Sequence, residues 1–358
     1  MPIPLLIGSC EPFSGKSALV LGLARQLVAQ GVGIRFGKPL ATSLEADAGG
    51  LDPDVRFIAD TLGLGTEQLL PSLAVLDPED ARQRLLRGSV SDDPGLGRLA
   101  VELAAAGDDL ALLEAAGSLS EGLLYGLSLP QLAEGLEAAV VLVHLWTDSG
   151  SVDALLQARQ LLGDRLAGVV LNAVSLEAVP RLREEIAPAL ERLGLPVYGV
   201  MPRSPLLRSV TVEELARRLE AEVLCCRDRL DLLVETLSIG AMNVNSAMEF
   251  FRRRRNMAVV TGADRTDIQL AALEASTQCL ILTGAGDPLP QLINRAEELE
   301  VPLLKVEHDT LTTVEVIERA FGHVRLHESV KATYAVRLVS EYCDFTRLFQ
   351  RLQLPVAA

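Results

Sequence analysis

Short apolar runs alternate with longer helical patterns along the whole chain, and this alternation constrains the fold more than any other feature. Runs that are apolar throughout are typical of strands buried on both faces, which occur in parallel sheets covered by helices. In such sheets the ligand-binding loops follow the carboxyl ends of the strands. The sequence therefore predicts an α/β fold. The candidate strands are 3–8, 33–37, 110–114, 139–145, 167–172, 196–200, 237–241, 257–262, 279–284 and 302–306.

The length of the chain and a restart of this pattern predict two domains. A chain of 358 residues is too long for one ordinary hydrophobic core. The alternation of strands and helices begins again after about residue 222. We therefore expect a larger parallel-sheet domain over residues 1–222 and a smaller α/β domain over residues 223–358. The expected helices include 15–30, 95–106, 151–162, 179–193 and a last one over 329–350.

Charge and cysteine usage exclude several classes of protein. The formal net charge of -15 leaves no broad positive field for nucleic acid or for an anionic membrane. The run Arg252 to Arg255 is better explained as a solvated helix end, with a nucleic-acid patch as the alternative. The five cysteines show no C-x-x-C spacing, which is typical of reduced thiols. No apolar stretch is long enough to span a bilayer and the N-terminus does not resemble a signal peptide, so we expect a cytoplasmic protein.

The stretch IGSCEPFSGKSALVLGL (7–23) predicts a phosphate-binding loop between a strand and a helix. Free backbone N–H groups at the start of such a helix bind anions. Lys16 is placed to reach the β- and γ-phosphates of a nucleotide, and the Ser17 hydroxyl to bind magnesium. The standard pattern G-x-x-x-x-G-K-[ST] has glycine where this chain has Cys10. A Gly-Lys-Ser that occurs by chance at a helix start is the alternative.

Three further charged positions follow strands at the edge where such a site would lie. Lys38 ends the second strand, where it can neutralise a phosphate or remain an ordinary surface lysine. Asp52 and Asp54 lie at the start of a helical stretch, where their carboxylates can meet a magnesium ion. The alternative is a simple helix cap by Asp52 with Pro53 in the first turn. Glu114 ends a buried apolar strand. A carboxylate there is costly unless it is partnered, and a metal ion is a natural partner.

The order SGKS, GKP, DPDV, LLEAAGS and VVLNAV resembles the dethiobiotin synthetase group of P-loop proteins over about residues 1–220. In that group the loop also lacks the first glycine, so Cys10 is a trait of the subgroup. The resemblance implies a P-loop NTPase-type domain that binds ATP and Mg²⁺, with Lys16 and Lys38 at the phosphates and the reaction centre. It implies magnesium ligands Ser17, Asp54 and Glu114. The implied nucleotide-binding residues are Glu11, Ser14, Gly15, Lys16, Ser17 and Asn172, with Asn172 near the adenine.

The loop after Glu114 departs from that group. Its members carry a glycine-rich stretch close to E-G-A-G-G, whereas this chain has Glu114-Ala115-Ala116-Gly117-Ser118. The bulkier alanines restrict the approach of a substrate to the backbone. Nucleotide binding is therefore expected more strongly than the ligase reaction. A loop over residues 114–126 that packs against the sheet would argue against a ligase.

The second half of the chain resembles a DRTGG domain over about 120 residues. The similarity lies in 237–251, 262–273 and 280–313, and Asp264-Arg265-Thr266 matches the first three residues of the naming motif. In long bacterial phosphate acetyltransferases this domain follows a P-loop domain of the same type. Because the chain ends at Ala358 before a catalytic acetyltransferase domain, we expect no such activity. The possible second ligand site comprises Asp264, Arg265, Thr266, Asp309 and Thr310, for which helix capping by Asp264 and Asp309 is the alternative.

These observations predict a nucleotide-responsive regulatory protein whose second domain forms oligomers or senses a small ligand. We expect a homo-oligomer, and a protein partner is a further possibility. The main alternative is an ATPase or an ATP-dependent ligase that activates a carboxylate. A third hypothesis is a P-loop scaffold without nucleotide, in which Lys16 points away from any pocket.

Overall fold

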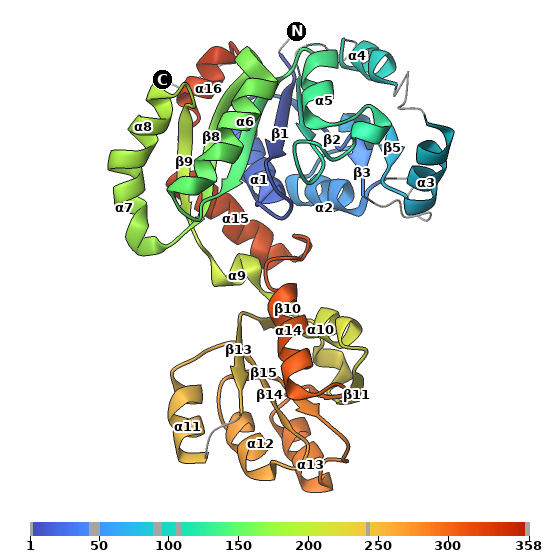
Figure 1. Ribbon diagram of the computed structural model, residues 1–358, viewed down its shortest axis with the longest axis vertical. Helices are drawn as coiled ribbons and strands as arrows, with labels where there is room; N and C mark the ends of the chain where they lie inside the picture. Colours follow the sequence, from blue (N-terminus) through green and yellow to red (C-terminus); the bar gives the residue numbers. More distant parts are fainter. Residues whose placement is uncertain are drawn as a thin grey trace. The chain divides into compact units, whose positions relative to one another are not determined.

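The computed structural model describes residues 3–42, 51–88, 95–104, 107, 109–240 and 244–354. The chain forms two compact units. Unit 1 comprises Met1–Arg203 together with Arg325–Ala358, and unit 2 comprises Ser204–Val324. Each unit is an α/β structure around its own sheet, as the alternating pattern predicts (Figure 1). Unit 2 is therefore an insertion in the sequence of unit 1.

The sheet of unit 1 has seven strands, all parallel, in the order β4-β2-β6-β1-β7-β8-β9. Its central strand β1 is buried on both faces, because Leu6 lies in one core cluster while Leu5 and Ile7 lie in the other. This explains the continuous apolar runs in the sequence. The strands span Leu5–Ser9 (β1), Ile34–Gly37 (β2), Leu69–Leu70 (β4), Leu110–Glu114 (β6), Ala139–Leu145 (β7), Leu166–Val174 (β8) and Val197–Pro202 (β9).

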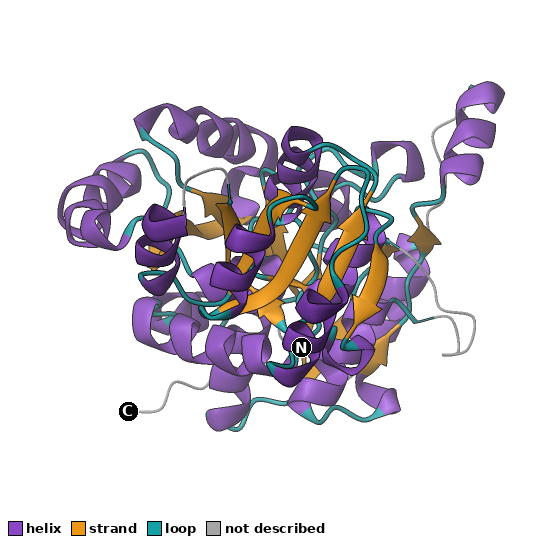
Figure 2. Ribbon diagram, turned by 90° about the horizontal axis from the view of Figure 1, so that it is seen from below, coloured by secondary structure: helices purple, strands orange, loops and turns teal. Residues whose placement is uncertain are grey.

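Helices cover both faces of the strands (Figure 2). Helices α4, α5, α6 and α8 contribute to one core cluster of unit 1, and α1, α2, α15 and α16 contribute to the other. Strands β3 (Leu40–Ala41) and β5 (Ala74–Val75) form a separate short parallel pair. The helices span Lys16–Ala29 (α1), Pro53–Leu62 (α2), Pro78–Arg87 (α3), Leu96–Ala104 (α4), Leu129–Gly135 (α5), Val152–Leu162 (α6), Val179–Arg181 (α7), Ala187–Arg192 (α8), Ser329–Tyr342 (α15) and Thr346–Arg351 (α16).

The end of the chain belongs to unit 1, which differs from the expected division at residue 222. Helix α15 lies beside α1 (Figure 1), where Gly22 leaves room for the side chain of Val339. A Cβ atom at position 22 would collide with that side chain. Phe345 and Phe349 continue the same core cluster. The apolar residues of the C-terminal helices thus complete the core of the first unit, which a linear reading of the sequence does not reveal.

Unit 2 has a five-stranded sheet in the order β11-β16-β15-β14-β13, in which only β11 runs antiparallel to its neighbour. It begins earlier than residue 223, because Val212 and Leu215 of α10 pack with Val260 of the sheet. A second pair, β10 with β12, is antiparallel. The elements span Pro205–Arg208 (α9), Val210–Thr211 (β10), Val212–Arg218 (α10), Glu222–Cys225 (β11), Leu233–Val234 (β12), Thr236–Ile239 (β13), Val244–Arg252 (α11), Met257–Gly262 (β14), Thr266–Leu273 (α12), Thr277–Thr283 (β15), Pro290–Glu298 (α13), Leu303–Val306 (β16) and Thr310–Ala320 (α14).

Every strand expected from an apolar run is present, and the strands that the sequence did not indicate are two to four residues long. Two expected helices are interrupted. A π-helical turn over Leu182–Ile186 separates α7 from α8. Cys343 has an extended backbone and ends α15, and the Asp344 carboxylate accepts a hydrogen bond from the backbone N–H of Thr346 at the start of α16.

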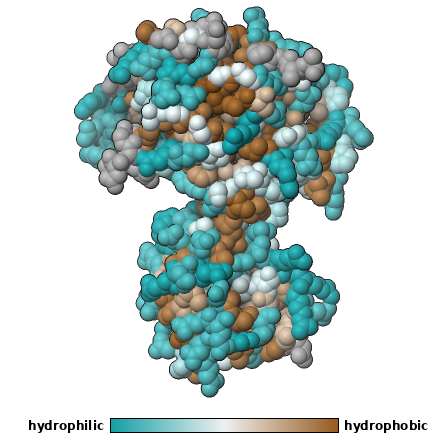
Figure 3. Space-filling view, turned by 180° about the vertical axis from the view of Figure 1, so that it is seen from behind, coloured by the Kyte–Doolittle hydropathy of each residue, from teal (hydrophilic) through white to brown (hydrophobic). Residues whose placement is uncertain are grey.

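The surface shown in Figure 3 is largely hydrophilic, with apolar patches between the polar residues. In the parts of the chain that the structure describes, no helix has both the length and the apolar character needed to cross a bilayer. Among the described residues, the exposed large apolar side chains include Leu85 and Leu86 of α3 and Val101 of α4.

The capping residue of α2 is expected to contribute strongly to the stability of unit 1. Asp52 is fully buried, and its carboxylate accepts from the backbone N–H groups of Asp54 and Thr42, each at 2.8 Å. We expect Asp52→Ala to lower the free energy of unfolding by roughly 1–3 kcal/mol, because it removes a cap and leaves buried donors unpaired. Urea unfolding measures this loss. Asp77→Ala, which removes the exposed cap of α3, should cost less, and an equal loss for both variants would contradict the expectation.

Candidate nucleotide site

The loop between β1 and α1 has the geometry of a phosphate-binding loop. Gly15 adopts a left-handed backbone with φ 101° immediately before α1, which favours glycine at this position. The Asn172 amide, at the end of β8, donates to the Ser14 carbonyl oxygen at 2.7 Å and fills the space beside Gly15. Asn172, expected near the adenine, thus also supports the loop. The N-terminal N–H groups of α1 carry no side-chain cap, as an anion site requires.

Lys16 lies at the carboxyl edge of the sheet and is 8% exposed. Its Nζ donates to Ser9 Oγ at 2.9 Å and to the Gly117 carbonyl oxygen at 3.4 Å. Burial lowers the pKa of Lys16, and the nearby Glu114 carboxylate opposes this effect. Both acceptors of its hydrogen bonds are uncharged, so a phosphate would be a stronger partner for the ammonium group.

Ser17 and Glu114 meet at the same edge. The Ser17 hydroxyl donates to Glu114 Oε1 at 3.1 Å. Glu114 is buried, and burial raises the pKa of its carboxyl group. Among the described residues, its Oε2 has no hydrogen-bond partner. A hydroxyl and a buried carboxylate with an unused oxygen fit a magnesium ion, which prefers oxygen ligands.

Lys38 is part of a buried charge network and is not a surface lysine. Its Nζ lies 2.6 Å from Asp54 Oδ2 and 3.4 Å from Asp52 Oδ2, and the side chain is 4% exposed. Burial alone would lower the pKa of Lys38, but Glu114, Asp54 and Asp52 together raise it above its ordinary value. Asp52 also caps α2, so the capping hypothesis for this residue is confirmed. The structure therefore brings Lys16, Ser17, Lys38, Asp54 and Glu114 into one charge network.

Two residues at this site, Arg325 and His327, were missed in the sequence. His327 Nε2 lies 2.9 Å from Asp54 Oδ1, and its ring packs on Phe57 with 5.5 Å between the ring centroids. Arg325 pairs with the same carboxylate at 3.8 Å and donates to Thr42 Oγ1 at 2.9 Å. Burial of Asp54 is outweighed by the hydrogen bond with His327 and the charge of Lys38, which hold the pKa of this carboxyl well below its usual range.

Glu11 and Cys10 lie on the other side of the loop, next to β7. Glu11 Oε1 accepts from the backbone N–H of Leu145 at 2.6 Å. Ser14 is fully buried, and its hydroxyl has no hydrogen-bond partner in the described parts of the chain. Burial raises the pKa of the Cys10 thiol to about 12, with a smaller contribution from Glu11. The Glu11 carboxylate is thus held by the backbone of β7.

The loop after Glu114 is packed against the sheet. Ala115, Ala116, Leu119 and Tyr125 are all buried and belong to one core cluster of unit 1. The Glu121 carboxylate accepts from the backbone N–H of Gly117 and holds the turn. The packing of these residues is what we expect of a chain that is not a ligase.

The expected second site in unit 2 lies at the carboxyl ends of β14, β15 and β16. Arg265 is the residue that precedes α12, so the hypothesis that Asp264 caps this helix is wrong; Asp309 does cap α14. Arg265 pairs with Asp267 at 3.5 Å. The hydroxyl groups of Thr310 and Thr283 lie 2.8 Å apart. Asp264, Arg265 and Thr266 lie between β14 and the start of α12, and Asp309 and Thr310 lie between β16 and the start of α14. The five residues therefore come from two connections at the carboxyl edge of the sheet.

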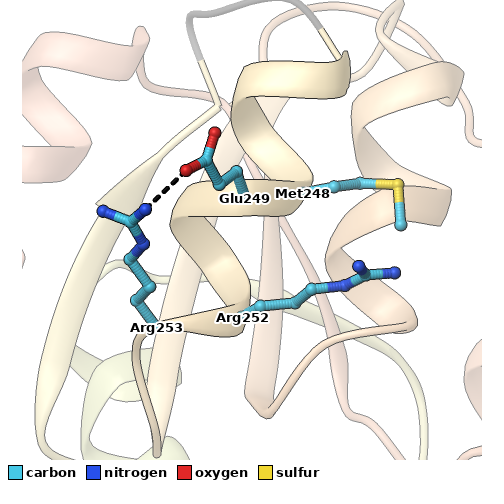
Figure 4. A pocket seen from close by; sticks show the side chains of 4 residues that line it. All are labelled: Met248, Glu249, Arg252 and Arg253. Atoms are coloured by element: carbon cyan, nitrogen blue, oxygen red, sulfur yellow. Dashed lines mark hydrogen bonds and ion pairs between the residues drawn. The ribbon is translucent and has the colours of Figure 1, made fainter.

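A pocket of about 400 Å³ lies elsewhere in unit 2, along α11. Figure 4 shows Met248 and Arg252 on one side of this helix and Glu249 and Arg253 on the other. Arg253 pairs with Glu249 at 2.5 Å, and Arg254 stacks on Phe250. These contacts agree with a solvated helix end for the arginine run.

Comparison with protein families identifies both parts of the chain. A model described as an AAA domain matches residues 4–211, and a model of the DRTGG domain matches residues 214–320. The ATP-dependent dethiobiotin synthetase BioD of Pseudomonas aeruginosa is 34% identical, over 53% of this chain and 85% of the relative. The Lys16, Asp54 and Glu114 motifs lie within the matched AAA-domain range.

Longer relatives match both parts together. The phosphate acetyltransferase of Nitratidesulfovibrio vulgaris is 25% identical over 97% of this chain, and that of Deinococcus radiodurans is 27% identical over 96%. The chain spans about half the length of these relatives, 51% and 50% respectively.

Solved structures show only distant likeness. MinD from Aquifex aeolicus is 14% identical with a TM-score of 0.34 and covers 57% of the chain. The CBS and DRTGG domains of a Clostridium perfringens pyrophosphatase are 17% identical with a TM-score of 0.30 over 44% of the chain. The family matches therefore decide the assignment: the chain belongs to the AAA-domain family of P-loop proteins, to which the dethiobiotin synthetases are similar, and it carries a DRTGG domain after its P-loop domain.

Proposed function

We propose that the protein is an ATP- and Mg²⁺-binding regulatory protein in which the P-loop site communicates with the DRTGG domain. One observation carries this proposal. Arg325 and His327, which hold the Asp54 carboxylate, are the first residues of unit 1 after unit 2 ends at Val324. A segment that follows unit 2 in the sequence thus contacts Asp54 of the proposed nucleotide site.

The residues around the loop support ATP and Mg²⁺ as the ligands. Lys16 and the N–H groups at the start of α1 would bind the phosphates, and Ser17, Asp54 and Glu114 would hold the metal ion. A bound metal ion neutralises phosphate charge and orients the phosphates. The unpartnered Oε2 of Glu114 is the observation in favour of a metal ion at this position.

Asp54 is both a proposed magnesium ligand and the residue that binds Arg325 and His327. Its Oδ2 is occupied by Lys38 and its Oδ1 by His327. A carboxylate that ligates Mg²⁺ has less negative charge to offer these donors, and the metal ion repels cations close by. Asp54 would therefore loosen its hold on His327 and Arg325 when it takes up the metal. Residues 325–328, which follow unit 2 in the sequence, would then be released.

The alternative ATP-dependent ligase is less well supported. The loop that would face a second substrate is packed into the core through Ala115, Ala116, Leu119 and Tyr125. Release of phosphate that depends on an added small acid would favour the ligase instead. The acetyl transfer of the longer relatives is not part of what we propose, because the chain spans about half of their length.

The test compares the affinity for Mg·ATP of the original chain with that of a variant in which Arg325 and His327 no longer contact Asp54. We expect the double variant Arg325→Ala/His327→Ala to bind Mg·ATP roughly 2- to 10-fold more tightly by calorimetry. The size follows from two half-exposed pairs, each worth less than about 1 kcal/mol. ATP without Mg²⁺ should show a smaller difference, because the metal ion is the competitor for Asp54.

The matched control removes an arginine and a histidine elsewhere. Arg337 is exposed on α15 and His308 is exposed in unit 2, so Arg337→Ala/His308→Ala should leave the affinity unchanged. Equal or weaker binding by the Arg325/His327 variant would contradict the proposed coupling. Absence of binding by both variants and by the original chain would contradict the nucleotide assignment itself.

The DRTGG domain is proposed to respond to a small anionic ligand at Asp264, Arg265, Thr266, Asp309 and Thr310 or to form oligomers. The arrangement of these residues at one edge of the sheet supports a ligand site. In unit 1, the exposed Leu85 and Leu86 of α3 offer a separate apolar surface for contacts between copies or with a protein partner. The five thiols are unpaired, which supports the expectation of a reducing, cytoplasmic setting.

A further inference from the structure

A second group of metal-binding side chains lies in the phosphate loop, on the side away from Glu114. Cys10 Sγ, a carboxylate oxygen of Glu11 and a ring nitrogen of His144 lie within 4.8 Å of one another. In the residues that the structure describes, no other three cysteine, histidine or acidic side chains are gathered in this way. Because β1 lies between β6 and β7, Glu114 on β6 and His144 on β7 flank opposite sides of the loop.

His144 is the residue that calls for an explanation. It is 2% exposed, and in the described parts of the chain neither of its ring nitrogens has a hydrogen-bond partner. Its Nδ1 faces Glu11 Oε2 at 3.4 Å without the geometry of a hydrogen bond. Buried polar groups are nearly always hydrogen-bonded. A buried imidazole with two unpaired nitrogens therefore indicates a binding partner that the described part of the protein does not itself provide. The strand position of His144, beside the end of β1, aims it at Cys10 and Glu11.

The other two side chains have the orientation that a metal ion needs. Glu11 Oε1 is fixed by the backbone N–H of Leu145 at 2.6 Å, which leaves Oε2 on the side of His144. This is a carboxylate oriented by an outer hydrogen bond, as is common among metal ligands. The Cys10 thiol makes a long contact of 3.6 Å from its Sγ to the Ala154 carbonyl oxygen, and a thiolate would give this contact up without great cost.

We propose that Cys10, Glu11 and His144 form a binding site for a borderline-soft divalent cation of the Zn²⁺ class. Sulfur, imidazole nitrogen and carboxylate oxygen are the ligands that Zn²⁺ and Co²⁺ take in tetrahedral sites, whereas Mg²⁺ requires an octahedral set of oxygens. Three protein ligands leave a fourth position for water. When the cation binds, the Cys10 thiol loses its proton to solvent, and no oxidation or reduction takes place. Two ligands belong to the phosphate loop, so the bound ion would fix the conformation of that loop.

The experiment titrates the intact chain, freed of metal, with Co²⁺ and follows the absorption of a cobalt–thiolate bond. We expect saturation at one equivalent, competition by Zn²⁺, and loss of the thiolate absorption in Cys10→Ser. Glu11→Gln and His144→Gln should weaken binding roughly 10- to 100-fold or more, since even outer-shell partners of metal ligands contribute that much. Glu11→Gln retains the acceptor for Leu145, so it serves if the histidine variant fails to fold.

Matched controls distinguish this site from other thiols and imidazoles. Cys226→Ser and His308→Ala remove a half-buried cysteine and an exposed histidine of unit 2, and both should bind Co²⁺ as the original chain does. No thiolate absorption in the original chain would overturn the proposal. So would binding that survives in Cys10→Ser and is lost in Cys226→Ser. These outcomes do not depend on nucleotide, so they are separate from the test of the P-loop site.

Discussion

Replacement of Lys16 by alanine should abolish most of the binding of Mg·ATP, with an affinity loss of at least roughly 10- to 150-fold. A hydrogen bond from an ammonium group to a charged partner contributes about 1.5–3 kcal/mol, and the lower and upper ends of this range correspond to those factors. Lys16 is nearly buried at the start of α1, where its present acceptors are the uncharged Ser9 hydroxyl and the Gly117 carbonyl. Calorimetric titration of both chains with Mg·ATP measures the difference.

The matched control for this variant is Lys305→Ala, which removes a lysine paired with Asp287 in unit 2. Its affinity for Mg·ATP should equal that of the original chain. Thermal unfolding of the Lys16 variant shows whether its loop and core remain folded. If a folded Lys16→Ala chain binds as tightly as the original, the P-loop is not the nucleotide site, and the scaffold hypothesis becomes the better one.

Replacement of Glu114 by glutamine should remove the contribution of Mg²⁺ to nucleotide binding. Glu114 offers a buried oxygen without a partner beside Ser17, so the neutral amide should weaken metal-dependent binding by roughly 10- to 100-fold. Binding of ATP in the presence of a chelator should change much less. The comparison of titrations with Mg²⁺ and with chelator isolates the effect on the metal ion.

The same substitution is not expected to unfold the protein without ligand. Burial raises the pKa of Glu114, so its contribution to stability is present below its unfolded pKa and is lost as the pH rises through its folded pKa. The amide of glutamine can still accept from the Ser17 hydroxyl and places no charge at this buried position. Glu185→Gln, on the exposed pair with Arg181, is the control. Equal dependence of Glu114→Gln and the original chain on Mg²⁺ would contradict the magnesium assignment.

The sequence was sufficient for those parts of the fold that depend on local pattern. Strands such as β1 and β7 are continuous apolar runs because both of their faces are buried, and this signal needs no tertiary information. The phosphate loop, Lys38 and Glu114 could be predicted because each lies at or directly after the carboxyl end of a strand, where parallel topology gathers functional residues. Two-residue strands such as β4 carry no such pattern, and the sequence gives no indication of them.

The contribution of the C-terminal segment could not be predicted, because it depends on contacts between residues far apart in the chain. His327 and Asp54 are separated by 273 positions. Nothing local in the sequence indicates a carboxylate partner for His327. Likewise, the apolar face of α15 predicts that this helix is buried but does not predict its neighbour. The neighbour is α1, and the close approach of the two helices depends on Gly22. Insertion of one unit into another has no local signature.

Hydrogen exchange at residues 325–331 tests the central claim most directly. The intact chain is compared without ligand, with ATP and chelator, and with saturating Mg·ATP, and the Lys16→Ala chain serves as a control. The proposal predicts faster exchange in this segment with Mg·ATP alone, because Asp54 then releases His327 and Arg325. Unchanged exchange at 325–331 while calorimetry shows Mg·ATP bound would contradict the coupling between the nucleotide site and the segment that follows the DRTGG domain.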